Sequence, residues 1–333
     1  MQQTLTSKNI DQLLPYFKQY GDSCMAYSGL QAGLEYFFIE DIGYISYLRY
    51  KHLLFAPNKG RIIVLANPIC AKENYQLLLQ QFLNAHPSAM FIQISRQIAV
   101  ILDQLGYQIN QFGIETEIPV QHYDLKGKSK SSLRQWRNKC RREAVEIEEI
   151  DLSQYNELAE IKSLSQSWLK NKGGKQLTFL NRPFLYQQER DTRCFIAKQN
   201  NKLIGIAVFD PFYRDNKVIG YYHNIDRIAD NAPHGVGPYL ILKAMDVFRQ
   251  EKVEILSLGM SPLYQLGAEF NYNKVTRKVL RFAYNKMNFL YPHKGNASHK
   301  KKFAGKQQRV YFCSAKGNTL WEIFILMKAI GIY

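Results

Sequence analysis

Short apolar runs alternate with amphipathic segments along this chain, and no other feature limits its fold as strongly. Residues 61–66 and 89–94 have the length and the β-branched content of buried strands. Residues 72–86 and 95–105 instead repeat their apolar side chains at helical spacing, and Gly106 follows them as a helix C-cap. This alternation predicts an α/β or α+β fold with a mixed sheet flanked by helices.

The same alternation continues beyond residue 122, so the chain holds material for more than one unit. Its 333 residues exceed an ordinary single domain. We expect an N-terminal domain over residues 1–122 and a C-terminal domain over residues 123–333, the second carrying the active site. In the second domain the pattern predicts a mobile loop at 171–175, helices at 131–144, 154–170 and 236–251, and strands at 145–150, 194–198, 203–209, 218–224, 254–259 and 309–314.

The charge of the chain is strongly basic, with 44 Lys and Arg against 28 Asp and Glu, a net charge of +16. Such an excess predicts a polyanionic partner, namely nucleic acid, an anionic membrane surface or a phosphate-bearing cofactor. Residues 126–142 hold eight basic side chains and no acidic one, and residues 293–309 also lack an acid. The alternative is a solvated basic face, balanced by the glutamates that follow it. Candidate phosphate-binding residues are Lys126, Lys128, Lys130, Arg134, Arg137, Arg141, Lys300 and Lys302.

Several classes of protein are disfavoured by the sequence. The first residues show no basic region followed by an apolar run, so we expect no signal peptide, and no run of 18 apolar residues predicts a membrane-spanning helix. The five cysteines are scattered without metal-type pairs, which predicts buried thiols in a reducing cytoplasm and no metal site. Residues 320–330 are either an interfacial helix or a terminal helix packed on the second domain.

A glycine-containing loop precedes the helix predicted at residues 236–251. Gly235 and Gly237 would let backbone amides approach an anion at the helix N-terminus, and Pro238 suits the first helical turn. A tight turn explains the same glycines equally well. The pattern is similar to the pyrophosphate loop of the GNAT N-acyltransferase fold, in which such a loop follows a central strand.

Polar groups gather at the end of the strand that leads into this loop, where functional sites are common. His223, Asp226 and Arg227 are the candidate catalytic residues. His234, Met260 and Ser261 are the candidate lining of an acceptor pocket, the last two from the stretch Leu258-Gly-Met-Ser-Pro-Leu. Each histidine could equally be structural.

Five stretches resemble one known family. They are Gln31-Ala-Gly-Leu-Glu-Tyr-Phe, Asp124-Leu-Lys-Gly-Lys, Asn231-Ala-Pro-His-Gly, Leu258-Gly-Met-Ser-Pro-Leu and Lys300-Lys-Lys-Phe. Together they resemble the soluble domain of bacterial phosphatidylglycerol lysyltransferases, from about residue 10 to the end. The resemblance implies two tandem GNAT-like units that move an amino acid from aminoacyl-tRNA to a lipid head group at the inner face of the membrane.

The sequence departs from the family pattern at particular positions. The family's D-x-x-R stretch places its arginine on Arg227 and its acid on Asn224, although Asp226 is close by. The family's loop acid is missing from Gly235-Val-Gly-Pro238. The family's membrane-spanning flippase half has no counterpart, so we expect a cytoplasmic protein that is peripheral at the inner membrane.

Three functions therefore remain open. The first is an aminoacyltransferase using aminoacyl-tRNA and a lipid or lipid-like acceptor, with Asp226 or His223 as base and Arg227 or the amides near Gly235 and Gly237 stabilising the oxyanion. The second is an N-acyltransferase that uses acyl-CoA or an acyl carrier protein. The third is a non-catalytic binder of anionic lipid or RNA. The first requires no cofactor and no obligate protein partner.

Overall fold

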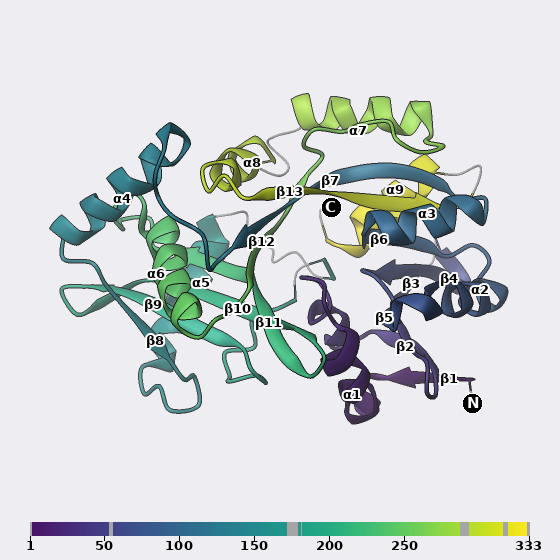
Figure 1. Ribbon diagram of the computed structural model, residues 1–333, viewed down its shortest axis with the longest axis horizontal. Coiled ribbons are helices and arrows are strands. Elements are labelled where there is room, and N and C mark those ends of the chain that lie inside the picture. The colour runs from purple at the N-terminus through teal and green to yellow at the C-terminus, as the bar shows by residue number, and fades with distance from the viewer. Residues whose placement is uncertain are drawn as a thin grey trace.

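The computed structural model describes residues 2–52, 56–171, 179–180, 182–286, 293–315 and 319–331. Its centre is one continuous mixed sheet in the order β1-β2-β3-β4-β6-β13-β7-β12-β11-β10-β9-β8, with β5 beside β3 (Figure 1). The loop predicted at residues 171–175 falls almost wholly outside the described residues.

The first half of the chain supplies a meander of antiparallel strands followed by a parallel strand. Strands β1 to β4 pair in sequence order, and β4 then pairs in parallel with β6 across α2. The elements are β1 (Gln2–Thr6), α1 (Ile10–Tyr20), β2 (Glu35–Ile39), β3 (Gly43–His52), β4 (Ala56–Leu65), β5 (Ile69–Cys70), α2 (Tyr75–Ala85), β6 (Met90–Ile94), α3 (Arg96–Gln104) and β7 (Gln108–Pro119).

The second half repeats that plan. Strands β8 to β11 form an antiparallel meander, and β11 pairs in parallel with β12 across α6. Helix α5 lies between β8 and β9, as α1 lies between β1 and β2. The elements are α4 (Ser131–Arg142), β8 (Glu146–Ile150), α5 (Leu158–Asn171), β9 (Arg193–Gln199), β10 (Lys202–Arg214), β11 (Lys217–Ile228), α6 (Val236–Gln250), β12 (Ile255–Pro262), α7 (Lys274–Lys286), α8 (His293–Lys301), β13 (Lys306–Ser314) and α9 (Thr319–Ala329).

The last strand of each half is exchanged between the two units. Strand β13, from the second half, pairs with β6 of the first half, whereas β7 of the first half pairs with β12 of the second. Strands β7 and β13 also pair with each other, which joins both units into one sheet. The expected α/β fold built from two similar units is thus observed, while the boundary near residue 122 stays a prediction.

The C-terminal helix α9 packs against the rest of the protein with one side, while Leu320 and Trp321 at its start are exposed. Ile323, Ile325 and Leu326 are buried in the same apolar cluster as Leu65 and Phe312. The same cluster includes side chains of strands β4 and β13, so the helix belongs to a core shared by both units, whereas packing on the second unit was expected. Of the two alternatives for residues 320–330, the packed terminal helix is the one observed.

The two faces of the second meander carry different helices. Helix α6 covers one face, where Phe195, Phe209 and Tyr221 pack against it, and α5 covers the opposite face over Ile206 and Ile225 (Figure 1). All five cysteines are buried, as predicted from their scattered positions. This two-sided cover decides which side chains of β11 can meet at a site.

Candidate active site

Strands β11 and β12 separate from each other soon after they begin to pair. Their parallel ladder joins Gly220–Tyr222 to Ile255–Ser257 only. Beyond it Gly259 takes a positive φ of 71°, and a side-chain carbon there would lie 2.5 Å from the Tyr222 ring. The carboxyl ends of adjacent parallel strands are where open α/β sheets bind ligands, so this fork is the candidate site.

A bulge in β11 decides which side chains point into the same space. Val208 pairs with Ile225 and Phe209 with His223, so Asn224 is an extra residue in the strand. Because of this residue, His223 and Asp226 lie on the α6 face although they are three positions apart. Arg227 lies on the α5 face. The structure thus places two of the three predicted catalytic residues on one face of the sheet and the third on the other face.

Asp226 lies against the first turn of α6. A Cβ atom added to Gly237 would sit 3.3 Å from the Asp226 Oδ2, which shows how closely the carboxyl approaches the helix. Its Oδ1 is buried and has no hydrogen-bond partner among the described residues. Desolvation raises the pKa of Asp226 from 3.8 to about 6. A carboxyl of that pKa can accept a proton near neutral pH.

His223 lies in a second, more basic part of the fork. Burial, together with His299 and Lys300, lowers the pKa of His223 to about 3, so the imidazole is neutral at physiological pH. The Lys300 amine donates a hydrogen bond to the Met260 carbonyl at 2.7 Å. Burial lowers the pKa of Lys300 to about 8. An imidazole that binds a proton so weakly is a poorer base than Asp226.

The start of α6 is covered by a stack of side chains from three elements. The Lys302 amine lies 4.6 Å from the Trp136 ring centroid, and that ring contacts His234 at 5.1 Å. Gly235 has a φ of 105° and directly faces Trp136 of α4. The described residues provide no side-chain cap for this helix. His234 and Lys302 therefore lie beside the N-terminus of this helix, while their expected roles in acceptor and phosphate binding stay predictions.

Arg227 is buried in an aromatic cage. It is 2% exposed, donates a hydrogen bond to the Tyr186 hydroxyl at 2.9 Å, and contacts the rings of Trp168 and Phe184 at 5.9 and 5.7 Å. The cage lies on the α5 face, whereas Gly235 and Gly237 begin a helix on the other face. This placement favours the backbone amides over Arg227 as the oxyanion-stabilising group.

A buried ion network that was not predicted from the sequence lies in the same part of the second unit. Arg182 forms two hydrogen bonds to Asp210, of 2.6 and 3.1 Å, and also pairs with Glu189. The Asn224 amide donates a hydrogen bond to the Arg182 carbonyl at 3.3 Å. Asp210 interrupts the apolar run of β10, and an acid in a buried strand requires a basic partner. That was the available signal.

The basic residues 126–142 divide into structural and exposed members. The Lys130 amine donates to the Asp124 carbonyl at 2.7 Å, and Arg134 donates to the Leu125 and Gly127 carbonyls. These two side chains hold the loop that precedes α4. Three other predicted phosphate-binding residues are exposed: Lys126, Lys128 and Arg141.

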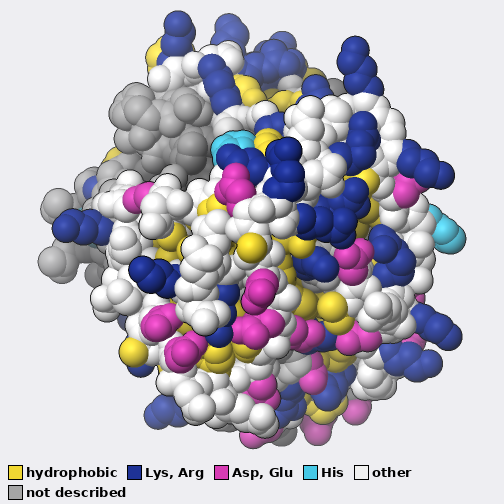
Figure 2. All heavy atoms as spheres, turned by 90° about the vertical axis from the view of Figure 1, so that its left-hand side faces the viewer, with side chains coloured by type: hydrophobic (Ala, Val, Ile, Leu, Met, Phe, Trp, Pro, Cys, Tyr) yellow, Lys and Arg dark blue, Asp and Glu magenta, His cyan; other side chains and the backbone are white. Residues whose placement is uncertain are grey.

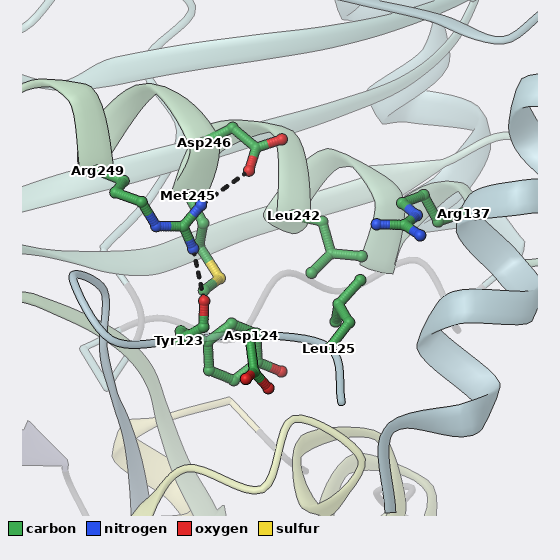
Figure 3. A pocket seen from close by; sticks show the side chains of 8 residues that line it. All are labelled: Tyr123, Asp124, Leu125, Arg137, Leu242, Met245, Asp246 and Arg249. Carbon is green, nitrogen blue, oxygen red and sulfur yellow. Dashed lines mark hydrogen bonds and ion pairs between the residues drawn. The ribbon is translucent and has the colours of Figure 1, made fainter. Parts of the chain in front are cut away.

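A cavity of about 260 Å³ lies between α4, α6 and residues 123–125 (Figure 3). Arg137 borders it, and its Nε is buried without a hydrogen-bond partner among the described residues. Arg249 crosses it to the Tyr123 carbonyl at 2.8 Å. The cavity holds neither Met260 nor Ser261, which lie on β12, with Ser261 buried beside β7. The predicted acceptor pocket is thus not part of this cavity.

Replacing Gly235 with Ala is expected to lower the free energy of unfolding by about 1–3 kcal/mol, because Ala is strained at positive φ. The added carbon would also lie 2.5 Å from the Trp136 Cβ, which cannot rotate away. Gly295→Ala is the control, since Gly295 has open space around it within α8 and Ala favours a helix. Urea denaturation of both variants checks this; equal stability would contradict it.

A family model described as "Phosphatidylglycerol lysyltransferase, C-terminal" matches residues 15–314. The chain belongs to this family. The lysyltransferase of Bacillus subtilis strain 168 is 23% identical over 332 residues, covering 96% of this chain and 37% of the relative. That of Staphylococcus epidermidis strain RP62A is 22% identical over 323 residues, covering 92% and 36%. The chain therefore spans little more than a third of the length of these lysyltransferases.

Two solved structures share the fold of this chain. L-PGS from Bacillus licheniformis superimposes with a TM-score of 0.80 at 20% identity, covering 98% of each chain. A structure of FemX gives a TM-score of 0.59 at 8% identity, covering 98% of this chain and all of the other. At these identities the likeness concerns the fold alone, and it confirms the predicted α/β architecture.

Proposed function

We propose that this chain transfers an aminoacyl group from aminoacyl-tRNA to the head group of phosphatidylglycerol or a similar anionic lipid. The observation that carries the proposal is the half-buried Asp226 carboxyl beside the first turn of α6, with a pKa of about 6. The relatives' name, phosphatidylglycerol lysyltransferase, supports lysine as the amino acid and phosphatidylglycerol as the acceptor.

The chemistry needs only a base and an oxyanion site. Asp226 removes the proton from the acceptor hydroxyl as its oxygen attacks the aminoacyl ester carbonyl. Amide groups at the start of α6, near Gly235 and Gly237, stabilise the negative charge on the carbonyl oxygen. The bond to the ribose oxygen of tRNA then breaks, and Asp226 returns the proton to that oxygen. The ester is already activated, so no covalent enzyme intermediate and no cofactor are required.

The remaining predicted residues have proposed roles in holding the substrates. The exposed Lys126, Lys128 and Arg141 suit the phosphates of tRNA, since exposed cations attract polyanions without needing a fitted pocket. Lys302, beside the start of α6, suits the lipid phosphate, and the buried Lys300, whose amine donates to the Met260 carbonyl, would add positive charge behind it. His234 and Met260 are proposed to contact the acceptor, and Ser261, which is buried beside β7, to support that surface from within. The setting would be the cytoplasmic face of a membrane.

The thioester alternative loses its particular support. It rested on Gly235 and Gly237 leaving space for a phosphate to approach the backbone. In the fold, Trp136 occupies the space beside Gly235, and Asp226 occupies the space beside Gly237. Packing therefore accounts for both glycines without a bound phosphate, although their N–H groups stay available to an oxyanion, and the glycines no longer favour an acyl-CoA donor over aminoacyl-tRNA.

The purified chain, given lysyl-tRNA and phosphatidylglycerol in detergent micelles, is expected to form lysylated lipid detectable by mass spectrometry. Alanyl-tRNA and acetyl-CoA, each with the same lipid, are the parallel arms. Product from acetyl-CoA alone would replace the proposal by the thioester alternative. Salt-sensitive binding of tRNA without any product would support the non-catalytic binder.

A further inference from the structure

Helix α7 presents apolar side chains to solvent on one side. Thr276 and Leu280 are buried against the body of the protein. Val275, Val279 and Phe282 are 57, 42 and 60% exposed, and their spacing of four and three residues aligns them in one stripe. A helix packed on a soluble protein normally turns polar residues outward, so this stripe needs an explanation.

The rest of the exposed surface of α7 is cationic. The helix carries Lys274, Arg277, Lys278, Arg281 and Lys286 and no acidic residue. Two of these side chains have partners in the segment that precedes the helix: Arg281 donates to the Leu266 carbonyl at 2.9 Å and Arg277 lies over the Tyr272 ring at 4.8 Å. The lysines at 274, 278 and 286 are exposed on the helix that carries the stripe.

Two further helices share the basic character of α7. Helices α4 and α8 also lack acidic residues, and Figure 1 shows α4, α8 and α7 along the same edge of the molecule. In Figure 2, turned about the vertical axis, Lys and Arg side chains crowd the upper part of the surface while Asp and Glu gather lower down. The stripe therefore belongs to a predominantly basic edge.

We propose that α7 docks this edge on an anionic lipid bilayer, with Val275, Val279 and Phe282 entering the headgroup region and the lysines binding lipid phosphates. Basic amphipathic helices bind membranes in this way, by combining apolar burial with attraction to anionic lipid. The proposal names the surface on which the proposed transferase meets its lipid. It rests on the proposed function for its purpose, but lipid binding itself requires no transfer.

A second copy of this chain is a poorer occupant for the same stripe. Two α7 helices would bring five positive charges against five, with no acid on either helix. The stripe also consists of only three side chains, and the area that these can bury is far smaller than the roughly 800 Å² per partner of a standard interface. Charge complementarity thus favours an anionic surface.

Flotation of the full chain with vesicles tests the proposal. Phosphatidylglycerol–phosphatidylcholine vesicles are expected to carry the chain upward at low salt, and vesicles of phosphatidylcholine alone are not. The triple variant V275Q/V279Q/F282Q is expected to bind on the order of tenfold more weakly, and K274Q/K278Q to a similar degree. The controls are L77Q, which removes an exposed leucine of α2, and K202Q/K217Q, which removes the same charge from exposed positions on β10 and β11.

A second readout reports insertion directly. In an F282W variant, phosphatidylglycerol vesicles are expected to shift the tryptophan emission to shorter wavelength, whereas L77W is expected to show no shift. Undiminished flotation of the triple variant, or equal flotation with neutral vesicles, would overturn the proposal. So would a change in oligomeric state of the triple variant, which would assign the stripe to self-association. Transfer to lipid in micelles reports the proposed chemistry separately, so the two failures are distinguishable.

Discussion

Replacing Asp226 with Asn is expected to lower the rate of transfer by about 10²–10⁴-fold, the usual effect of removing a general base. The amide fills the same space beside Gly237 but cannot accept the proton. For the unmodified chain, the rate should rise with pH through about 6, the pKa of this carboxyl. In the variant this rise of the rate with pH should be absent. Single-turnover transfer measured across pH checks both expectations.

The same variant is expected to be at least as stable as the unmodified chain at neutral pH. Burial raises the pKa of Asp226 from 3.8 to about 6, so the folded chain binds this proton more tightly than the unfolded chain does. The stability that the protonated Asp226 carboxyl contributes is therefore fully present below about pH 4 and is lost as the pH rises through about 6. Asn cannot ionise, so the gain from the substitution should appear above that range and vanish below it.

Asp246→Asn is the matched control, because this exposed acid lies on α6 and pairs only with a neighbouring arginine of the helix among the described contacts. Its rate and stability should both stay close to those of the unmodified chain. A variant at Asp226 that keeps its full rate, or whose rate keeps the same dependence on pH, would remove Asp226 as the base.

Replacing Arg182 with Met is expected to lower the free energy of unfolding by about 3–5 kcal/mol, because it leaves buried carboxylates without their cation. Arg182 is 3% exposed and Asp210 is fully buried, so water cannot take over the lost contacts. The double variant Arg182→Met/Asp210→Leu should lose less than the sum of the two single changes, since it buries no unpaired charge at Asp210. Equilibrium denaturation with urea measures all three.

An exposed pair offers the comparison that isolates burial. Arg214 and Glu254 approach to 2.8 Å but are 47 and 51% exposed. Arg214→Met should therefore cost about 0–1 kcal/mol. If both arginine substitutions had the same effect, burial of the network around Arg182 would not account for its stability.

The local sequence was sufficient to predict the start of α6, which is part of the candidate site, and one hairpin turn of the fold. The helix predicted at residues 236–251 is α6, at Val236–Gln250, because Gly235 and Pro238 mark its start. The turn between β9 and β10 follows from local sequence as well, because asparagine is favoured where a hairpin turn requires positive φ. Asn200 and Asn201 adopt φ values of 50° and 60° there. Each signal depends on a few neighbouring residues, so no distant contact was needed to find it.

Strand β7 could not be predicted from the local sequence. It occupies the middle of the sheet between β13 and β12, yet no strand was predicted over Gln108–Pro119. Its inward positions include the polar Asn110, Gln111 and Thr116, all nearly inaccessible to solvent. Sequence patterns find strands through alternating apolar residues. A polar central strand becomes stable only through its neighbours, which here are β12 and β13, both more than 130 residues further along the chain.

By itself the sequence determined the alternation of strands and helices, the start of α6 and the location of the acid-free basic segments, because these follow from local propensity and composition. Only the tertiary structure decided that β7 and β13 exchange units, since strand pairing between distant segments leaves no local mark. It also decided that the bulge at Asn224 turns His223 and Asp226 toward α6 and Arg227 toward α5. One inserted residue reverses the faces of a strand, and only its partner strand reveals the insertion.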